Sequence, residues 1–206
     1  MVKRETICTA ALASLLSLAA CVEPTPIVLS TRFTPPRGVP WLPADTARAG
    51  GPAAASCRIH LAEIRDLRSD PQSMGMLQNR PVRATDSISW VRSGFDALSR
   101  DSRMRLVDGV ADDSDLVLRV ELINAYVMNV TTETRAVSVV LRVRYERGGA
   151  MLDEQVYRGR HDALTWGTGE SETQSSFDTA LAQLLATVDR DVVARCPALT
   201  AGAELR

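Results

Sequence analysis

Two long segments in which apolar and polar residues alternate constrain the fold more than any other part of the chain. They run from Leu116 to Val130 and from Val137 to Tyr145, and a period of two is typical of β-strands that bury one face. The short polar connection between them predicts an antiparallel hairpin. The expected buried face comprises Leu116, Leu118, Val120, Leu122, Asn124, Tyr126, Met128 and Val130 on one strand and Val137, Val139, Leu141, Val143 and Tyr145 on the other.

Charged residues on the other face of the hairpin predict its register. When Arg119 is placed opposite Glu146, Glu121 falls opposite Arg144, and both pairs have opposite charges. A slip by one residue would turn the apolar face toward water. The polar face around Arg119, Glu121, Arg142 and Arg144 is therefore our candidate partner surface, although an antiparallel sheet commonly exposes one polar face without any partner.

Two helices are predicted from apolar stripes at helical spacing. The first begins near Thr85, Asp86 or Ser87, any of which can cap a helix. The second is expected from Ser175 to Arg195, with Ser175 and Asp178 at capping-box spacing. The expected buried stripes are Ile88, Val91, Phe95 and Leu98 on the first helix and Phe177, Leu181, Leu184, Val188 and Val192 on the second, with Trp90 beside the first stripe.

Shorter strands are expected at 58–65, 103–107 and 151–160, whereas residues 66–81 contain several turn formers and are expected to be a loop. The order of elements is then strand, helix, four strands, helix. This order predicts an α+β fold, a two-layer sandwich in which a mostly antiparallel sheet of about five strands carries two helices on one face.

The first 20 residues have the layout of a secretory signal, with Lys3 and Arg4 ahead of an apolar run from Ile7 to Ala20. As a helix, this run would span about 21 Å, short of the roughly 30 Å of a bilayer core. Leu18-Ala19-Ala20-Cys21 resembles a lipobox, and the resemblance implies cleavage before Cys21 and acyl chains on that residue. An ordinary secretory signal with an incidental cysteine is the alternative.

Residues 21–56 have the composition of a tether, since seven of the ten prolines lie there. A polyproline-like chain of this length would reach about 110 Å. Trp41 and Leu42 lie between Pro40 and Pro43, as in a short recognition segment. We expect instead that Trp41 packs back on the domain.

The other two cysteines, Cys57 and Cys196, bracket the region 57–197, which has the size of a single domain. We expect this region to be the α+β domain and to lie in the periplasm. Cys8 would leave with the signal and Cys21 would be acylated, so the remaining pair is expected to form a disulfide. The bond would require the end of the last helix to lie near the start of the first strand, with the helix antiparallel to it. Residues 198–206 are expected to be a disordered tail.

Charge argues against a nucleic-acid partner. Loss of Lys3, Arg4 and Glu5 with the signal leaves 22 of the 24 basic and 24 of the 25 acidic side chains, a formal net charge of −2. No basic field remains to attract nucleic acid.

Catalytic and metal-binding motifs are incomplete. His161-Asp162 could orient an imidazole, but no Gly-x-Ser-x-Gly nucleophile motif accompanies it. The segment 167–171 lacks the Gly-Lys-Ser/Thr end of a phosphate loop, and 112–115 lacks the twelve-residue calcium pattern. We therefore expect no enzyme activity, no metal and no cofactor.

The lipobox, the proline-rich segment, the Val-rich hairpin and the closing helix together resemble the YajG-type and related small accessory lipoproteins of the outer membrane. Arg65-Asp66-Leu67-Arg68 is the stretch most similar to a specific signature. The resemblance implies a non-catalytic, partner-binding domain at the inner leaflet of that membrane. Val22, in place of an aspartate after Cys21, resembles the signal for outer-membrane delivery.

Two functions follow as expectations. The first is an interaction module of a cell-envelope complex, held to the membrane by acyl chains on Cys21. The second is a carrier of lipid or another small amphiphile, in which Tyr126, Met128, Trp90 and Phe95 line a cavity between sheet and helices.

Overall fold

The computed structural model describes residues 24–37, 41–42, 56–108, 114–164 and 169–196. The expected signal peptide, Cys21 and residues 198–206 lie outside these ranges. The elements, in chain order, are β1 (Ile27–Leu29), β2 (Cys57–Asp66), β3 (Ser73–Leu77), β4 (Arg80–Ala84), α1 (Ser87–Asp101), β5 (Met104–Leu106), β6 (Leu116–Asn129), β7 (Thr134–Arg147), β8 (Ala150–Leu164) and α2 (Glu170–Arg195). The predicted α+β class is confirmed. The predicted order is incomplete, because β1, β3 and β4 form in segments expected to be tether and loop.

The described strands form one curled, mixed sheet in which β6 is central. One edge of β6 pairs antiparallel with β7, which pairs in turn with β8, and the other edge pairs in parallel with β2 and, farther along, with β3. β5 lies parallel to β2, and β4 and β1 continue the sheet beyond β3. The expectation of a mostly antiparallel sandwich is therefore wrong. Parallel strands need a crossover connection, and α1 lies between β2 and its parallel partners β5 and β6 in the chain.

Up to Leu122, the hairpin of β6 and β7 forms in a register two residues away from the predicted one, and beyond Leu122 the difference is one residue. Val120 lies opposite Val143, and a bulge interrupts β6 between Leu122 and Asn124. Because a bulge inserts one extra residue, it exchanges the two faces of the strand beyond it. The predicted buried face is correct up to Leu122 and wrong afterwards. The predicted apolar face of β7, by contrast, is completely buried.

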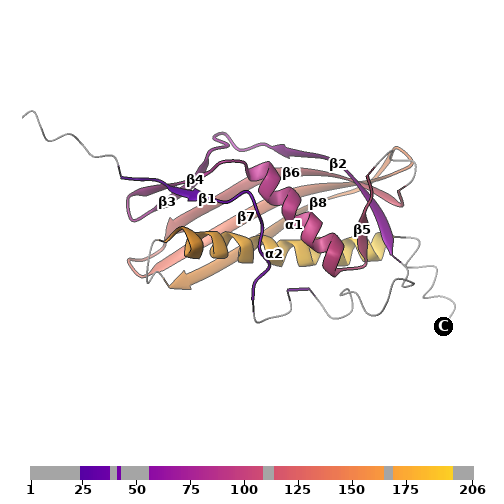
Figure 1. Cartoon of the computed structure of the whole chain (residues 1–206). Helices are drawn as coiled ribbons and strands as arrows, with labels where there is room; N and C mark the ends of the chain where they lie inside the picture. Colours follow the sequence, from indigo (N-terminus) through magenta and orange to yellow (C-terminus); the bar gives the residue numbers. More distant parts are fainter. Residues whose placement is uncertain (1–23, 38–40, 43–55, 109–113, 165–168, 197–206) are drawn as a thin grey trace, which may run out of the picture.

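Both helices lie on one side of the strands, in front of them in Figure 1. The Asp86 side chain caps α1 by accepting a hydrogen bond of 2.9 Å from the Ser89 amide. The predicted stripe is buried except for Ile88, which is 38% exposed, and Trp90 joins the core as expected.

Helix α2 begins at Glu170 rather than at Ser175, with Gly169 as its N-cap residue. The capping box predicted at Ser175 and Asp178 is therefore wrong, since both residues lie inside the helix. The predicted stripe of α2 from Phe177 to Val192 is buried.

Two glycines allow α2 to approach its neighbours closely. A Cβ atom at Gly94 of α1 would lie 2.9 Å from Leu185 Cδ1. A Cβ atom at Gly159 of β8 would lie 1.8 Å from the backbone oxygen of Ala180, which is far too close for two non-bonded atoms. Only glycine at position 159 is compatible with this approach of helix to strand.

Part of the expected tether belongs to the sheet and the core. Ile27 of β1 pairs with Val82 of β4, and Ile27, Leu29, Phe33 and Leu42 are buried. Trp41 lies against Phe33, with ring centroids 5.7 Å apart, and its Nε1 donates to Asp101 Oδ2 at 3.1 Å. The expectation that Trp41 packs on the domain is confirmed. Of the expected tether, residues 24–37 and 41–42 are described, and β1 within them is a strand of the sheet.

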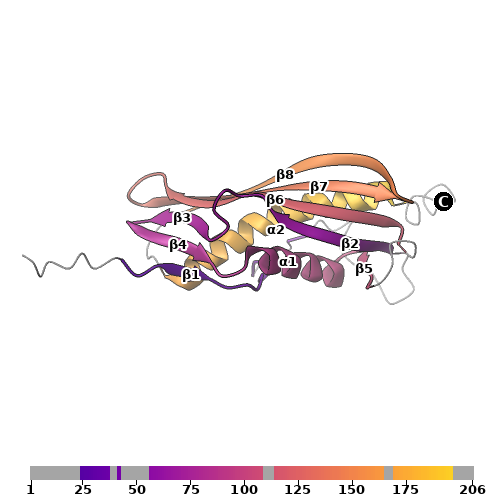
Figure 2. The same cartoon turned by 90° about the horizontal axis from the view of Figure 1, so that it is seen from above.

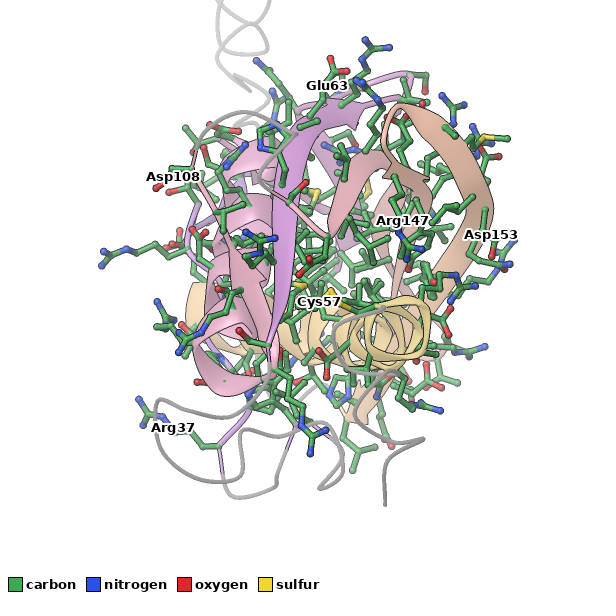
Figure 3. All side chains as sticks on the ribbon, turned by 90° about the vertical axis from the view of Figure 1, so that its right-hand side faces the viewer. Arg37, Cys57, Glu63, Asp108, Arg147 and Asp153 are labelled. Carbon is green, nitrogen blue, oxygen red and sulfur yellow. A yellow bond between two sulfur atoms is a disulfide. The ribbon has the colours of Figure 1, made fainter. Side chains whose placement is uncertain are left out.

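The disulfide between Cys57 and Cys196 is present, with the two Cα atoms 5.9 Å apart. It joins the start of β2 to the end of α2, which runs antiparallel to β2 as predicted (Figure 1). Figure 3 looks at this end of the molecule and shows Cys57 beside the last turn of α2. Figure 2 shows β1 and the β3–β4 hairpin at the opposite end.

Candidate functional site

The site lies on the open face, which we define as the side of β2, β6, β7 and β8 turned away from the helices. Outward positions of neighbouring strands are in register there, so that Arg119 lies opposite Arg144 and Glu121 opposite Arg142. The structure thus brings together all four residues of the predicted partner surface. Because Arg119 and Arg144 face each other across β6 and β7, each of them pairs with carboxylates along the diagonal or on the next strand.

Ion pairs join these four residues with four others in two adjacent networks, one of Arg65, Glu63, Arg119 and Glu146 and one of Glu121, Arg142, Arg144 and Glu154. We call these eight residues together the charge ladder. Arg119 Nε donates to Glu146 Oε1 at 2.8 Å, along the diagonal. Arg142 Nη1 donates to Glu121 Oε2 at 2.9 Å. Four acidic and four basic groups give the ladder no net charge. The sequence pattern did not identify Glu63, Arg65 and Glu154, because they lie on strands whose neighbours it could not specify.

The carboxylates of the ladder favour the charged form of its arginines. The hydrogen bond to Glu154, together with the nearby charge of Glu121, raises the pKa of Arg144. The hydrogen bond to Glu63 raises the pKa of Arg65 in the same way. Exposed ion pairs stabilise a fold by only about 0–1 kcal/mol each. The ladder therefore contributes little to stability, and its main effect is to hold its side chains in defined orientations.

The ladder surrounds a shallow groove of about 240 Å³ on the open face. Its lining residues are Glu63, Arg65, Arg119, Val120, Glu121, Arg144 and Glu146. Figure 3 shows Glu63 at the rim of the sheet and on the side turned away from α2. The groove is polar, and none of the described helices covers it.

The stretch from Arg65 to Arg68 divides into an exposed and a buried part. Arg65 belongs to the charge ladder, and its side chain is 60% exposed. Asp66 and Arg68 form an ion pair of 2.7 Å, and their side chains are 7% and 6% exposed. Arg68 also donates to the backbone oxygen of Ser73 and to Ser87 Oγ. The buried pair therefore joins the end of β2 to β3 and to the start of α1.

Burial alone would raise the pKa of Asp66. Hydrogen bonds from Arg68 and Ser87 outweigh this effect and lower the pKa below its usual value. The pair is thus a structural element, and only Arg65 of this stretch reaches the candidate site.

A second, less polar groove of about 290 Å³ lies on the open face toward the tip of the β6–β7 hairpin. It is lined by Asn124, Tyr126, Met128, Val130, Ala136, Val137, Ser138 and Arg160. Tyr126 is 44% and Met128 50% exposed, whereas Trp90 and Phe95 are buried on the other side of the sheet. The cavity predicted for a lipid carrier is therefore wrong, because the bulge in β6 separates these four residues.

The candidate catalytic pair does not assemble. His161 and Asp162 are consecutive residues of β8 and point to opposite faces of the sheet. Asp162 Oδ1 instead accepts a hydrogen bond of 3.0 Å from Arg160 Nε. Burial and the nearby charge of Arg135 lower the pKa of His161. Asp162 therefore does not orient the imidazole of His161, as the predicted pair would require.

The other two motifs lie partly outside the described residues. Gly167 and Thr168 of the glycine-rich segment are outside, and Ser171 lies in the first turn of α2. Of the acidic segment, Asp115 is described, and its carboxylate accepts a hydrogen bond of 2.8 Å from the Arg58 amide. This contact ties the start of β6 to β2.

Among the parts of the chain that the structure describes, no helix combines the length and the apolar character needed to cross a membrane. No family model matches the chain, and no curated protein matches it. Solved structures do match. Protein XCC0632 of Xanthomonas campestris, assigned to family model DUF330, has a TM-score of 0.52 and 11% identity over 82% of this chain and 95% of that one.

Two further matches have lower scores. The minor lipoprotein of Acinetobacter baumannii has a TM-score of 0.43 and 12% identity, over 66% of this chain and 95% of that one. Lipoprotein GNA1162 of Neisseria meningitidis has a TM-score of 0.33 and 10% identity, over 68% of this chain and 99% of that one. At such identities, the match to XCC0632 establishes a shared fold.

Proposed function

We propose that this chain is a bacterial outer-membrane lipoprotein whose domain is a non-catalytic docking module of a cell-envelope protein complex. The observation that carries the docking function is the charge ladder around its groove on the open face. The lipobox-like Leu18-Ala19-Ala20-Cys21 supports the anchor, and Val22 supports outer-membrane delivery. The resemblance to small accessory lipoproteins favours a partner protein over a substrate.

The chemistry of the ladder indicates what kind of partner fits it. Because the eight charges cancel, the ladder produces little long-range attraction for either sign of charge. Each arginine is already held by a carboxylate, so binding would cost little side-chain entropy. A protein surface that offers both a cation and a carboxylate at short range would therefore match it.

The anchor is tested by replacing Cys21 with serine in full-length protein expressed in bacteria. We expect the wild type to incorporate labelled palmitate and to fractionate with the outer membrane. The C21S variant should lose the label and the membrane association. Unchanged labelling and fractionation of the variant would contradict the anchor.

The docking surface is tested with a photo-crosslinking amino acid placed at Arg144 in cells. Arg92 of α1 is the control, because it is an arginine accessible to solvent on the helical side. We expect a discrete adduct, with a protein that mass spectrometry can identify, from position 144 and not from position 92.

A second variant tests the pattern of charges and not only their number. The exchange Glu121→Arg with Arg142→Glu keeps one internal ion pair but reverses its direction. We expect the adduct at position 144 to fall at least fivefold while the thermal unfolding midpoint stays close to that of the wild type. An equal yield of adduct before and after the exchange would contradict docking through the ladder.

A further inference from the structure

We propose that the domain stands on the lipid surface with one defined end, through an apolar tip patch of Met76, Met128, Val130 and Leu164. This proposal rests on the proposed acyl anchor at Cys21. It adds an orientation and a second contact with the bilayer, neither of which follows from the anchor alone.

The distance between the anchor and the folded part is short. Arg80 Nε donates a hydrogen bond of 2.9 Å to the backbone oxygen of Thr25, and two residues later β1 begins. The four Cα–Cα steps from Cys21 to Thr25 can span at most about 14 Å. The acylated residue is therefore kept close to the β3–β4 turn, and the bilayer must lie near that turn.

The pairing of the strands shows which other segments share this end. Gly75 of β3 lies opposite Val127 of β6, in parallel. Two residues farther along both strands, Leu77 is level with Asn129, and Leu77 pairs with Arg80 across the turn. The β3–β4 turn, Thr25 and the tip of the β6–β7 hairpin therefore lie at one level. Figures 1 and 2 show β1 and the β3–β4 hairpin at this end and the last turn of α2 at the other.

The apolar side chains of the tip patch lie at the same level. Met76 and Met128 each follow the paired residues Gly75 and Val127 by one position, so they are neighbours on adjacent strands. Leu164 pairs with Thr134, whose backbone oxygen accepts a hydrogen bond of 2.8 Å from the Val130 amide. The four residues of the patch are 50% to 57% exposed in the free domain.

Contact with the bilayer would remove this apolar surface from water, which is favourable without any specific headgroup. Tyr126 lies next to the patch and is amphipathic, a property favoured at membrane interfaces. The acyl anchor keeps the patch at the membrane, so even a weak contact would be populated. One occupant, the lipid surface, accounts for both the position and the composition of the patch.

The same orientation leaves the charge ladder accessible. Arg119 precedes Asn129, the last residue of β6, by ten positions, which corresponds to about 34 Å along a strand. With the tip patch on the bilayer, the ladder would face the periplasm well above the headgroups. Lipid contact and docking of a partner would then use different parts of the open face.

The experiment uses full-length lipidated protein reconstituted in phosphatidylcholine vesicles. An environment-sensitive NBD dye is attached to Val130→Cys or, as the control, to Met151→Cys. Met151 is also apolar and is 67% exposed, but it follows the β7–β8 turn at the opposite end of the domain. The introduced cysteine is the only free thiol of the processed protein, in which the signal with Cys8 is removed, Cys21 is acylated and Cys57 is bonded to Cys196.

We expect the emission of the dye at position 130 to shift to shorter wavelength in vesicles and to be quenched at least threefold more by a lipid-borne quencher than at position 151. Equal quenching at the two positions, in protein that floats with the vesicles, would overturn the tip contact and leave the anchor intact. Protein that fails to float would overturn both proposals. Because both substitutions are at exposed positions, both variants should fold, which near-ultraviolet circular dichroism can verify.

Discussion

Trp90 Nε1 donates a hydrogen bond of 2.8 Å to Asp178 Oδ1, and this contact links α1 to α2 inside the core. Asp178 is only 3% exposed, and it also accepts hydrogen bonds from Gln174 Nε2 and the Thr34 amide. Burial raises the pKa of Asp178 to about 6, and these hydrogen bonds oppose the rise only in part. Periodicity did not indicate this buried carboxylate, because Asp178 was expected to cap the helix.

The raised pKa of Asp178 predicts how stability changes with pH. Between pH 3.8 and about 6, the folded state holds a proton that the unfolded state has released, so the free energy of unfolding falls as the pH rises. The change amounts to about 3 kcal/mol for a shift of this size. Asp178→Asn should abolish it.

Urea unfolding at pH 4 and pH 6.5 measures this effect. Relative to wild type, the Asp178→Asn variant should gain up to about 3 kcal/mol between the two pH values. Other carboxylates contribute equally to both proteins and cancel in the difference. Asp96→Asn, at an exposed position of α1, serves as a control, and an identical pH dependence of wild type and Asp178→Asn would contradict the prediction.

Loss of the buried ion pair between Asp66 and Arg68 should be costly. Arg68→Ala leaves the Asp66 carboxylate buried without its cation, and we expect a loss of about 3–5 kcal/mol in the free energy of unfolding. Arg65→Ala removes an exposed arginine of the same stretch and should have little effect on the free energy of unfolding. Chemical denaturation of the two variants compares them directly, and similar losses would show that the buried pair has no special role.

The disulfide should stabilise the domain mainly by restricting the unfolded chain. It joins residues 139 positions apart, and the entropy of closing such a loop corresponds to about 4–5 kcal/mol. The variant Cys57→Ser with Cys196→Ser should lose about this amount. Reducing agent should destabilise the wild type and leave the double variant unchanged; a wild type that is insensitive to reduction would count against the bond.

Gly159 should not tolerate a side chain. In Gly159→Ala, the new Cβ would meet the backbone oxygen of Ala180, so α2 must move away from β8. Overpacking of this kind costs roughly 1–3 kcal/mol or more. The neighbouring exposed substitution Arg158→Ala should stay within about 0.5 kcal/mol of wild type. Thermal unfolding of the two variants tests this prediction, and equal midpoints would mean that α2 can move away from β8 at little cost in stability.

Strict alternation made β7 predictable, because every second residue from Val137 to Tyr145 is large and apolar. The same rule failed in β6 beyond Leu122, since both faces carry apolar residues there. Ala125 and Val127 are small and buried, whereas Tyr126 and Met128 are large and exposed. The bulge between Leu122 and Asn124 exchanges the two faces, and alternation alone does not reveal a bulge.

Remote pairing also explains the strands that were missed. β1 has three residues in a proline-rich segment, and its partner β4 lies in a segment rich in turn formers. Local propensity could not identify either strand alone. In the candidate site, the period of two correctly placed Arg119, Glu121, Arg142 and Arg144 on one surface. The additional carboxylates of Glu63 and Glu154 depend on the strand order, which periodicity does not reveal.

The pairing of β1 with β4 determines where a recombinant fragment of this protein can begin. A fragment starting at Cys57 would keep both cysteines of the disulfide but would lack Ile27, Leu29, Phe33 and Leu42 from the core. Val82 would lose its backbone partner at the same time. Such a fragment would expose an unprotected sheet edge and a hydrophobic surface, and both features favour aggregation during purification. A fragment for crystallisation should therefore retain the chain from Pro24 onward.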